Sequence, residues 1–488
     1  MSNSCINLKV NMFVFIISMC LFTLGYDSFP IMTTALFTLF LSNIIYSLRK
    51  LKRRFFFGSF TLSVFLFLIG RPFFRLFELG LDNEWYEYGN IASRSAIFLI
   101  YLSLFSLIIG QFIGERLNFN LEYRTIEYKR IINSNTCRRW QKFSKYFFYV
   151  TIFFKIIVEL ERLLYMGGRE YAEVYATFAS NLPAVIHGLA GLNVYFLCMY
   201  LATLPVKKKA VITILLYVFT TVPWLIIGAR NFFVSALVFM FSYMFIRYLV
   251  TPEEEWFGKK EKNMMVLLLP LGIFFLGAYN YLREFESSVD IFNISIFLDF
   301  VIKQGVSFNT LCLGMESIRD IKDLGDKYYL FGPLIDYLKY GVLGQVIFDN
   351  HGLPAGNSME MIQYGHSMAH DLSYLTRDDY LDGHGFGSSY IFEVFYDFGL
   401  FGLAFYNIFL GFLFSQIIRL CLSGYLNFTI LLVIFTSIFM APRSSASDFL
   451  TFIVKYQFWI SILSIYILIS LCKKSIINHN NCNNDSGY

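Results

Sequence analysis

The chain has 488 residues, of which 56% are hydrophobic, 19% aromatic and only 15% charged, and its formal net charge is +5. Soluble domains carry about a quarter charged residues, so this composition, with a mean hydropathy of +0.55, excludes a soluble globular protein. It predicts an integral membrane protein.

Apolar runs near the ~20 residues that a helix needs to cross a bilayer recur along the chain. These runs do not alternate apolar and polar residues as the strands of a membrane barrel do. The sequence therefore predicts an all-α polytopic membrane protein with about twelve transmembrane helices. They are placed at 10–25, 30–48, 55–73, 96–114, 146–166, 184–204, 210–227, 232–250, 264–280, 400–418, 428–442 and 449–471.

The first apolar run resembles a signal peptide in length only. Asp27 and Pro30 follow it without a small-residue cleavage site, and a second span comes at once. We therefore take it as the first transmembrane helix.

Lysine and arginine are unevenly distributed over the predicted connections. With the N-terminus inside, the inside connections hold 24 of them and the outside connections 6, leaving aside the long loop between the ninth and tenth spans. The positive-inside rule then predicts that both termini are cytoplasmic and that this loop is periplasmic.

The chain is predicted to divide into four parts. Residues 1–280 form nine transmembrane helices with short loops, and 281–398 form the large loop, with short surface helices at 291–298 and 334–338. Residues 399–472 form three more transmembrane helices, and the polar 473–488 form a disordered cytoplasmic tail.

The eight cysteines predict no disulfide framework, because only Cys312 falls in the external loop and it has no partner there. Neither a Cys/His metal spacing nor a nucleotide-binding glycine motif occurs in the sequence. We predict no metal and no cofactor.

Three arginines are expected on the outer face at the ends of late helices. Arg230 lies between the seventh and eighth spans, Arg283 follows the ninth, and Arg443 precedes the last. A guanidinium presents a planar fork that suits phosphate oxygens. A single such arginine has the alternative of anchoring its helix at the lipid headgroups, but three on short turns beside the loop favour a diphosphate site.

The long loop is acidic and rich in histidine. It holds 17 Asp and Glu against 7 Lys and Arg, together with His351, His366, His370 and His384. This composition suits a neutral, hydroxyl-rich substrate, and histidine can take a proton near neutral pH. His366 and His370 would share one face of a helix, but without an H-E-x-x-H pattern a metal pair is not favoured.

A glycine-rich stretch at 383–389 leads into the tenth span. Glycines let backbone approach a ligand closely, which points to a substrate-binding segment that includes Gly385, Gly387, Ser388 and Ser389. Either serine is placed to cap a short helix that carries Glu393. An acidic side chain this close to the bilayer is costly unless it acts in catalysis or pairs with an arginine for structure, and the sequence leaves both alternatives open.

The pattern Gly-x-Gly-Ser-Ser-x-Ile-x-Glu-x-x-Tyr-x-Phe-Gly-x-x-Gly at 385–402 resembles the bacterial O-antigen polymerases of the Wzy type, the oligosaccharide repeat unit polymerases. So do the Gly-x-Arg at 228–230, the aromatic-rich many-span layout and the large late external loop. The layout covers nearly the whole chain, whereas the specific motifs cover only the regions near 230 and 383–443.

The resemblance implies a helical, GT-C-like glycosyltransferase of the bacterial inner membrane whose active site faces the periplasm. It implies transfer of a growing glycan from undecaprenyl diphosphate to the non-reducing end of a second lipid-linked repeat unit. The implied partners are these lipid-linked oligosaccharides, membrane lipids, a chain-length regulator and a flippase, with no nucleic acid. The related ligases carry a His-Asn pair where this chain has Gly387-Ser388, which counts against ligase activity.

Such a reaction needs cations to stabilise the departing diphosphate and a base to deprotonate a sugar hydroxyl. The three arginines fit the first role. For the base we rank Glu393 above His384, because a helix holds a catalytic group more rigidly than a glycine-flanked loop. His384 would then hydrogen-bond the acceptor sugar or a phosphate, and His370 and Asp371 are the next candidates for the base.

Two rival functions stay open. A ligase uses the same chemistry on a lipid A core acceptor. A flippase would need ionisable groups near the bilayer midplane, for which the candidates are Lys155, Glu159, Glu161, Arg162 and Lys455.

Overall fold

The computed structural model describes residues 2–77, 90–117, 120–167, 174, 178–259, 263, 301–354 and 356–485. The chain divides into two compact units. Unit 1 comprises Met1–Asn118, Phe257–Ile418 and Ser437–Phe449, and unit 2 comprises Phe119–Trp256, Arg419–Thr436 and Leu450–Tyr488. Every regular element in the described ranges is a helix, as the sequence predicts.

Eight helical stretches are long and apolar enough to cross a membrane, and each coincides with a predicted span. They are Phe29–Arg49, Leu51–Arg75, Ile91–Glu115, Ala184–Ala202, Lys207–Ile227, Arg230–Val250, Tyr390–Cys421 and Tyr425–Arg443. The first and last predicted spans overlap the shorter apolar stretches Asn11–Leu24 and Tyr456–Cys472.

Two of the twelve predicted spans are not among these. The span predicted at 146–166 falls in the helix α7 (Asn135–Met166), whose last turns carry four charged side chains and which is not apolar enough to count as a candidate span. The span predicted at 264–280 and the surface helix predicted at 291–298 lie outside the described residues, as does Arg283.

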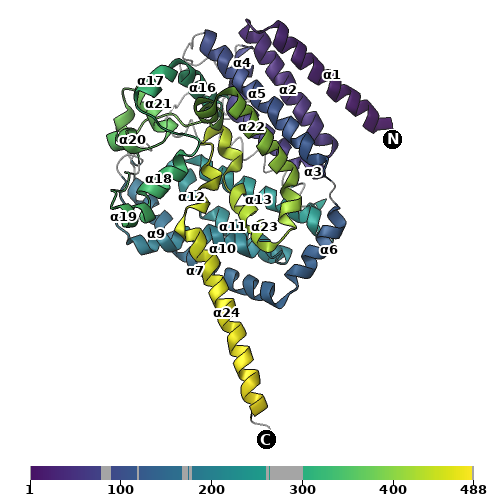
Figure 1. Cartoon of the computed structure of the whole chain (residues 1–488), viewed down its shortest axis with the longest axis vertical. Helices are drawn as coiled ribbons and strands as arrows, with labels where there is room; N and C mark the ends of the chain where they lie inside the picture. The colour runs from purple at the N-terminus through teal and green to yellow at the C-terminus, as the bar shows by residue number, and fades with distance from the viewer. Residues whose placement is uncertain are drawn as a thin grey trace. The chain divides into compact units, whose positions relative to one another are not determined.

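Unit 1 begins with a set of long helices. α1 and α2 lie side by side (Figure 1), and α2 also packs against α3 and α5. The third predicted span is one continuous helical stretch made of α3, a π-helical turn and α4. These elements are α1 (Ser2–Leu24), α2 (Phe29–Arg49), α3 (Leu51–Val64), η1 (Phe65–Ile69), α4 (Gly70–Arg75) and α5 (Asn90–Glu115).

The close contact between α5 and α22 (Tyr390–Cys421) depends on glycines. A Cβ added at Gly110 would lie 1.9 Å from the carbonyl oxygen of Ile408, and one added at Gly411 would lie 2.0 Å from that of Leu107. A Cβ added at Gly114, one turn after Gly110, would lie 1.7 Å from the hydroxyl oxygen of the Ser415 side chain. Small residues four apart let two membrane helices approach backbone to backbone, so this seam fixes the position of α22.

α22 is not one straight helix, because Gly399 has φ 65° and ψ −164°. This conformation is open essentially only to glycine. Tyr390, nine residues before Gly399, donates a hydrogen bond of 2.8 Å to Asn407, eight residues after it. The segment 390–398 therefore folds back against the segment that begins at Leu400, which is where the sequence predicts the tenth span to start.

The described part of the long loop consists of short helices: α16 (Val306–Glu316), α17 (Ile318–Asp323), α18 (Gly332–Tyr340), α19 (Val342–Phe348), α20 (Met359–Tyr364), α21 (Met368–Thr376) and the 3₁₀ turn η2 (Tyr380–Asp382). α16 packs against α5 and η1, and its side chains are largely buried. This part of the polar interruption thus belongs to the core of unit 1.

In unit 2, α7 and α10 pack along each other, and α9, α12 and α24 also contact α7. Its other helices are α6 (Leu121–Ile132), α9 (Ala184–Gly191), α10 (Asn193–Ala202), α11 (Lys207–Phe219), α12 (Val222–Ile227), α13 (Arg230–Val250), α23 (Tyr425–Phe435) and α24 (Tyr456–Asp485). α24 continues through most of the tail that the sequence predicts as disordered, since each residue added to a formed helix gains a hydrogen bond.

Candidate functional site

The glycine-rich segment is held on α21 and on the loop before α20. The Phe386 amide donates to Ser373 Oγ at 2.8 Å. Asn357 Nδ2 donates to the carbonyl oxygens of Tyr380 and His384 at 2.7 and 2.8 Å. The backbone of His384 is therefore fixed from two sides although its imidazole is exposed.

Glu393 lies three residues into α22 and is fully buried, at 0% exposure. Ser388 Oγ donates to its Oε1 at 2.5 Å, and the backbone amide of Ala446 donates to its Oε2 at 2.7 Å. The serine thus closes the first turn of the helix from five residues upstream. The second bond ties the helix to a segment 53 residues later in the chain.

Ala446 is held from both arms of the folded-back α22. Its amide bonds Glu393 on the first arm, and its carbonyl oxygen accepts a hydrogen bond of 2.6 Å from Tyr406 on the second. The chain just before Ala446 is therefore fixed as well. That stretch contains Arg443, the last residue of the 3₁₀ turn η3 (Ile438–Arg443).

Arg443 lies next to the glycine-rich segment in unit 1. A Cβ added at Gly387 would lie 3.4 Å from the Arg443 carbonyl oxygen. Arg443 Nη1 donates to Gln304 Oε1 at 2.8 Å, and its guanidinium carbon lies 5.9 Å from the centre of the Phe67 ring. The guanidinium is half-buried. The fold thus brings the backbone of Arg443 next to the exposed Gly385–Gly387 backbone, from segments far apart in sequence.

Residues 7–475 match the sequence model of the family described as O-antigen polysaccharide polymerase Wzy. The chain belongs to this family. No curated protein and no solved structure matches it at a significant level. With the apolar helices, membership makes the chain a multi-pass membrane protein and a glycosyltransferase-type polymerase of lipopolysaccharide biosynthesis.

The four predicted glycan-binding residues of the polymerase divide into two pairs. Gly385 and Gly387 are exposed, whereas Ser388 and Ser389 are buried. Ser388 is engaged with Glu393. The glycines are therefore the exposed part of this segment, and Ser388 supports it through its hydrogen bond to Glu393.

His370 and Asp371 occupy neighbouring positions on α21 with different surroundings. Burial lowers the pKa of His370, which keeps its imidazole neutral near pH 7, and its Nδ1 lies 2.9 Å from Tyr380 Oη. Asp371 is 0% exposed and accepts hydrogen bonds from Lys327 Nζ and Tyr329 Oη, each at 2.8 Å. A paired, buried carboxylate of this kind holds the loop helices together.

Arg230 begins α13 in unit 2, directly after the turn that ends α12. Gly228 makes this turn possible at φ 110°, the left-handed conformation that commonly ends a helix. The arginine is thus in the tight turn that the sequence predicts. Because Arg230 and Arg443 belong to different units, their convergence on one diphosphate stays a prediction.

Three residues of the site carry no signal in the sequence. Ala446 contributes only its backbone, while Tyr406 and Gln304 reach the site across 40 and 139 positions. Only the run Ala441–Ser445 hinted at this region, through its arginine and its turn-forming residues.

Proposed function

We propose that the polymerase transfers a growing glycan from undecaprenyl diphosphate to the non-reducing end of a second lipid-linked repeat unit on the periplasmic face of the inner membrane. Family membership over nearly the whole chain supports the polymerase activity. The glycine-rich segment and Arg443 in one site supply what such a transfer needs, an open backbone surface for a sugar and a cation for a diphosphate.

The observation that carries this proposal is the pair of hydrogen bonds made by the backbone of Ala446. Glu393 and Tyr406 hold its amide and its carbonyl oxygen, and so fix Arg443 beside Gly387. A cation held in place before the reaction stabilises developing negative charge without reorganisation, which makes it effective in catalysis. This arrangement supports a reaction in which a diphosphate departs.

The chemistry balances without a nucleotide. The bond between the anomeric carbon of the donor glycan and its diphosphate oxygen breaks, and the diphosphate leaves with the electron pair. The hydroxyl oxygen at the non-reducing end of the acceptor forms the new bond to that carbon, and its proton passes to a base. Arg443 would bind the departing diphosphate with its planar fork.

The burial of Glu393 supports a division of roles that differs from the sequence-based ranking. Both carboxylate oxygens already accept hydrogen bonds within the protein, and no surface of the side chain is exposed. We therefore assign Glu393 to positioning the Arg443 segment. His384, exposed and fixed at its backbone, becomes the preferred base.

The other predicted residues keep secondary roles. His370 supports η2 through Tyr380, whose carbonyl oxygen is held together with that of His384 by Asn357. Asp371 supports α21. Arg230 and Arg283 would bind the diphosphate of the donor or the acceptor.

Deleting the gene in its host tests the function. We expect lipopolysaccharide with a single repeat unit, because ligation continues when polymerisation stops. Plasmid-borne wild-type protein should restore the ladder of longer chains, and Arg443→Ala at matched protein level should not.

The rival functions give a different profile. Complete loss of attached repeats on deletion would indicate a ligase or a flippase and would overturn the proposal.

A further inference from the structure

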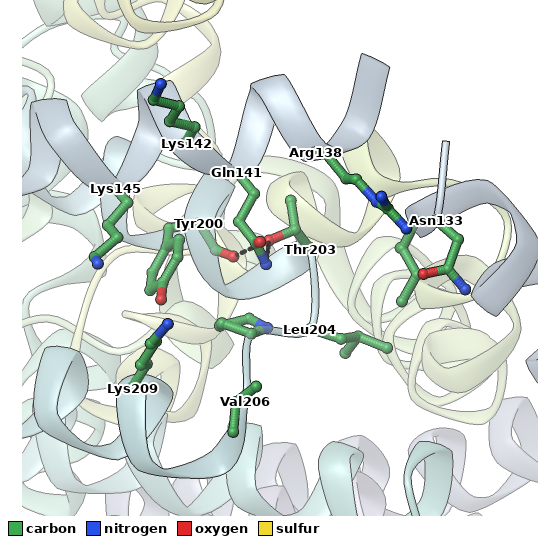
Figure 2. A pocket seen from close by; sticks show the side chains of 12 residues that line it. Asn133, Arg138, Gln141, Lys142, Lys145, Tyr200, Thr203, Leu204, Val206 and Lys209 are labelled. Atoms are coloured by element: carbon green, nitrogen blue, oxygen red, sulfur yellow. Dashed lines mark hydrogen bonds between the residues drawn. The ribbon is translucent and has the colours of Figure 1, made fainter. Parts of the chain in front are cut away.

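A basic pocket lies in unit 2, outside the site described above. It occupies about 310 Å³ where the end of α6, the first turns of α7, the end of α10 and the start of α11 meet. Figure 2 shows Lys145 from α7 and Lys209 from α11 pointing toward the space beside the Tyr200 ring, whereas Lys142 points away from it. Arg138 also lines the pocket, next to Asn133.

The lining contains four cations and no carboxylate. In the part of the chain that the structure describes, none of the four forms an ion pair with Asp or Glu. α7 and α11 both begin at this pocket, after Ser134 and Val206, so the positive ends of two helix dipoles add to the side-chain charge. The pocket is therefore built for a negatively charged group.

The wall opposite α7 is a strained loop that other residues hold in place. Leu204 has φ 50°, a conformation that costs a non-glycine residue energy and persists only where its surroundings impose it. Gln141 donates to Thr203 Oγ1 at 3.0 Å, and the buried Arg247 donates to the carbonyl oxygen of Pro205 at 2.7 Å. These bonds fix the loop on both sides of Leu204, so the pocket is preformed.

Apolar side chains lead away from the pocket along both helices that begin there. Six of them are 41–65% exposed, at spacings of three or four residues on one face of each helix. They are Tyr146, Tyr149 and Phe153 on α7 and Ile212, Leu215 and Phe219 on α11. A free phosphate ion would leave these apolar helix faces uncovered. The acyl chains of a lipid whose headgroup lies in the pocket would cover them.

We propose that this pocket binds the phosphate of an anionic phospholipid headgroup, with the acyl chains lying along α7 and α11. Lys145 and Lys209, which point toward the same space beside Tyr200, hold the phosphate oxygens. The pocket residues fall in the basic connections near 133–145 and 203–209, which the positive-inside rule places at the cytoplasmic leaflet, where anionic lipids attract basic residues.

The test uses the full chain in nanodiscs of phosphatidylcholine with increasing phosphatidylglycerol, and native mass spectrometry counts the phosphatidylglycerol retained. Lys145→Gln and Lys209→Gln should each lower the apparent affinity about fivefold, the effect of one basic residue at a membrane surface. The matched control is Lys208→Gln, because Lys208 is exposed beside Lys209 and does not line the pocket. It should bind like the wild type.

Two outcomes would overturn the proposal. If Lys208→Gln loses as much affinity as Lys209→Gln, the attraction is a general surface effect with no site. If inorganic phosphate raises the melting temperature in pure phosphatidylcholine nanodiscs, and the two pocket variants lose that gain, the pocket takes a free anion. Melting temperatures measured without phosphate identify any variant that folds poorly. If one pocket variant folds poorly, the lipid affinity of the other one tests the proposal.

Discussion

At the scale of single residues, the site depends on which side chains already make hydrogen bonds within the protein. Both carboxylate oxygens of Glu393 accept hydrogen bonds, one from Ser388 and one from Ala446. Arg443 donates a hydrogen bond from one guanidinium nitrogen to Gln304. Buried donors that lose their acceptor cost about 1–3 kcal/mol each. Substitutions that keep or remove an acceptor therefore separate a positioning role from a chemical one.

Glu393→Gln should keep most of the polymerisation, because its amide oxygen still accepts from the Ala446 amide and the Ser388 hydroxyl can turn to accept from its NH₂. Glu393→Ala should abolish it, since the Ala446 amide is then buried without a partner and the Arg443 segment loses its position. Chain-length ladders of lipopolysaccharide at matched protein levels measure both. An inactive Glu393→Gln beside an active His384→Ala would restore Glu393 as the base.

Arg443→Lys keeps the charge but loses the planar fork, and so does Arg230→Lys. We expect each to reduce polymerisation by roughly a hundredfold to a thousandfold, the range seen when one donor to a developing anion is removed. Arg94→Lys serves as the control, because Arg94 makes a partly exposed ion pair with Asp27 at 2.9 Å. Normal ladders from both test variants would show that these arginines anchor helices at the interface.

At the scale of helices, the fold-back of α22 puts Glu393 and Tyr406 on two arms that hold the same residue. The turn rests on the backbone of Gly399, and the position of the second arm rests on the glycine contacts with α5. Neither the turn at Gly399 nor the glycine contacts with α5 can be recognised in the sequence from charge or hydropathy.

Gly399→Ala should destabilise the protein by about 1–3 kcal/mol, because alanine rarely adopts this conformation. The cost lies in the backbone alone, since no atom lies within 4 Å of the added Cβ. Thermal unfolding in nanodiscs and the chain-length ladder should both show the loss. Gly424→Ala is the matched control, with equally open space and an extended φ of 164° that alanine tolerates. Equal melting temperatures for the two variants would contradict a strained turn at Gly399.

At the scale of the whole molecule, the proposed reaction requires that the loop helices face the periplasm. The charge asymmetry of the connections predicts this orientation. A cysteine at an exposed loop position tests it without disturbing the site. Asn357 is unsuitable because it supports the backbone of His384.

His351→Cys should react with a membrane-impermeant maleimide in cells whose outer membrane has been made permeable, because His351 is exposed in the loop. Lys208→Cys should react only after the inner membrane is opened. The wild-type chain gives the background from its own cysteines. Labelling in the reverse order would invert the topology and remove the proposed reaction from the periplasm.

The class of protein, the helical architecture and the positions of most spans could be predicted from the sequence. These follow from apolar runs of a length that the bilayer imposes, and such runs are local. It also pointed to the glycine-rich segment, Glu393 and Arg443, because glycine clusters and charges beside apolar helices stand out in one dimension. The helix predicted at 146–166 is present, but the charged side chains in the last turns of α7 leave it outside the set of helices that are apolar enough to cross a membrane.

The contacts that join these residues could not be predicted in this way. The hydrogen bonds that join Ala446 to Glu393 and to Tyr406 span 53 and 40 residues, and Ala446 contributes only its backbone, which any residue except proline supplies. The reversal at Gly399 and the backbone contact at Gly110 look the same in sequence as any other glycine. Side-chain pairing across a fold depends on which helices meet, and that is set by packing summed over the whole chain.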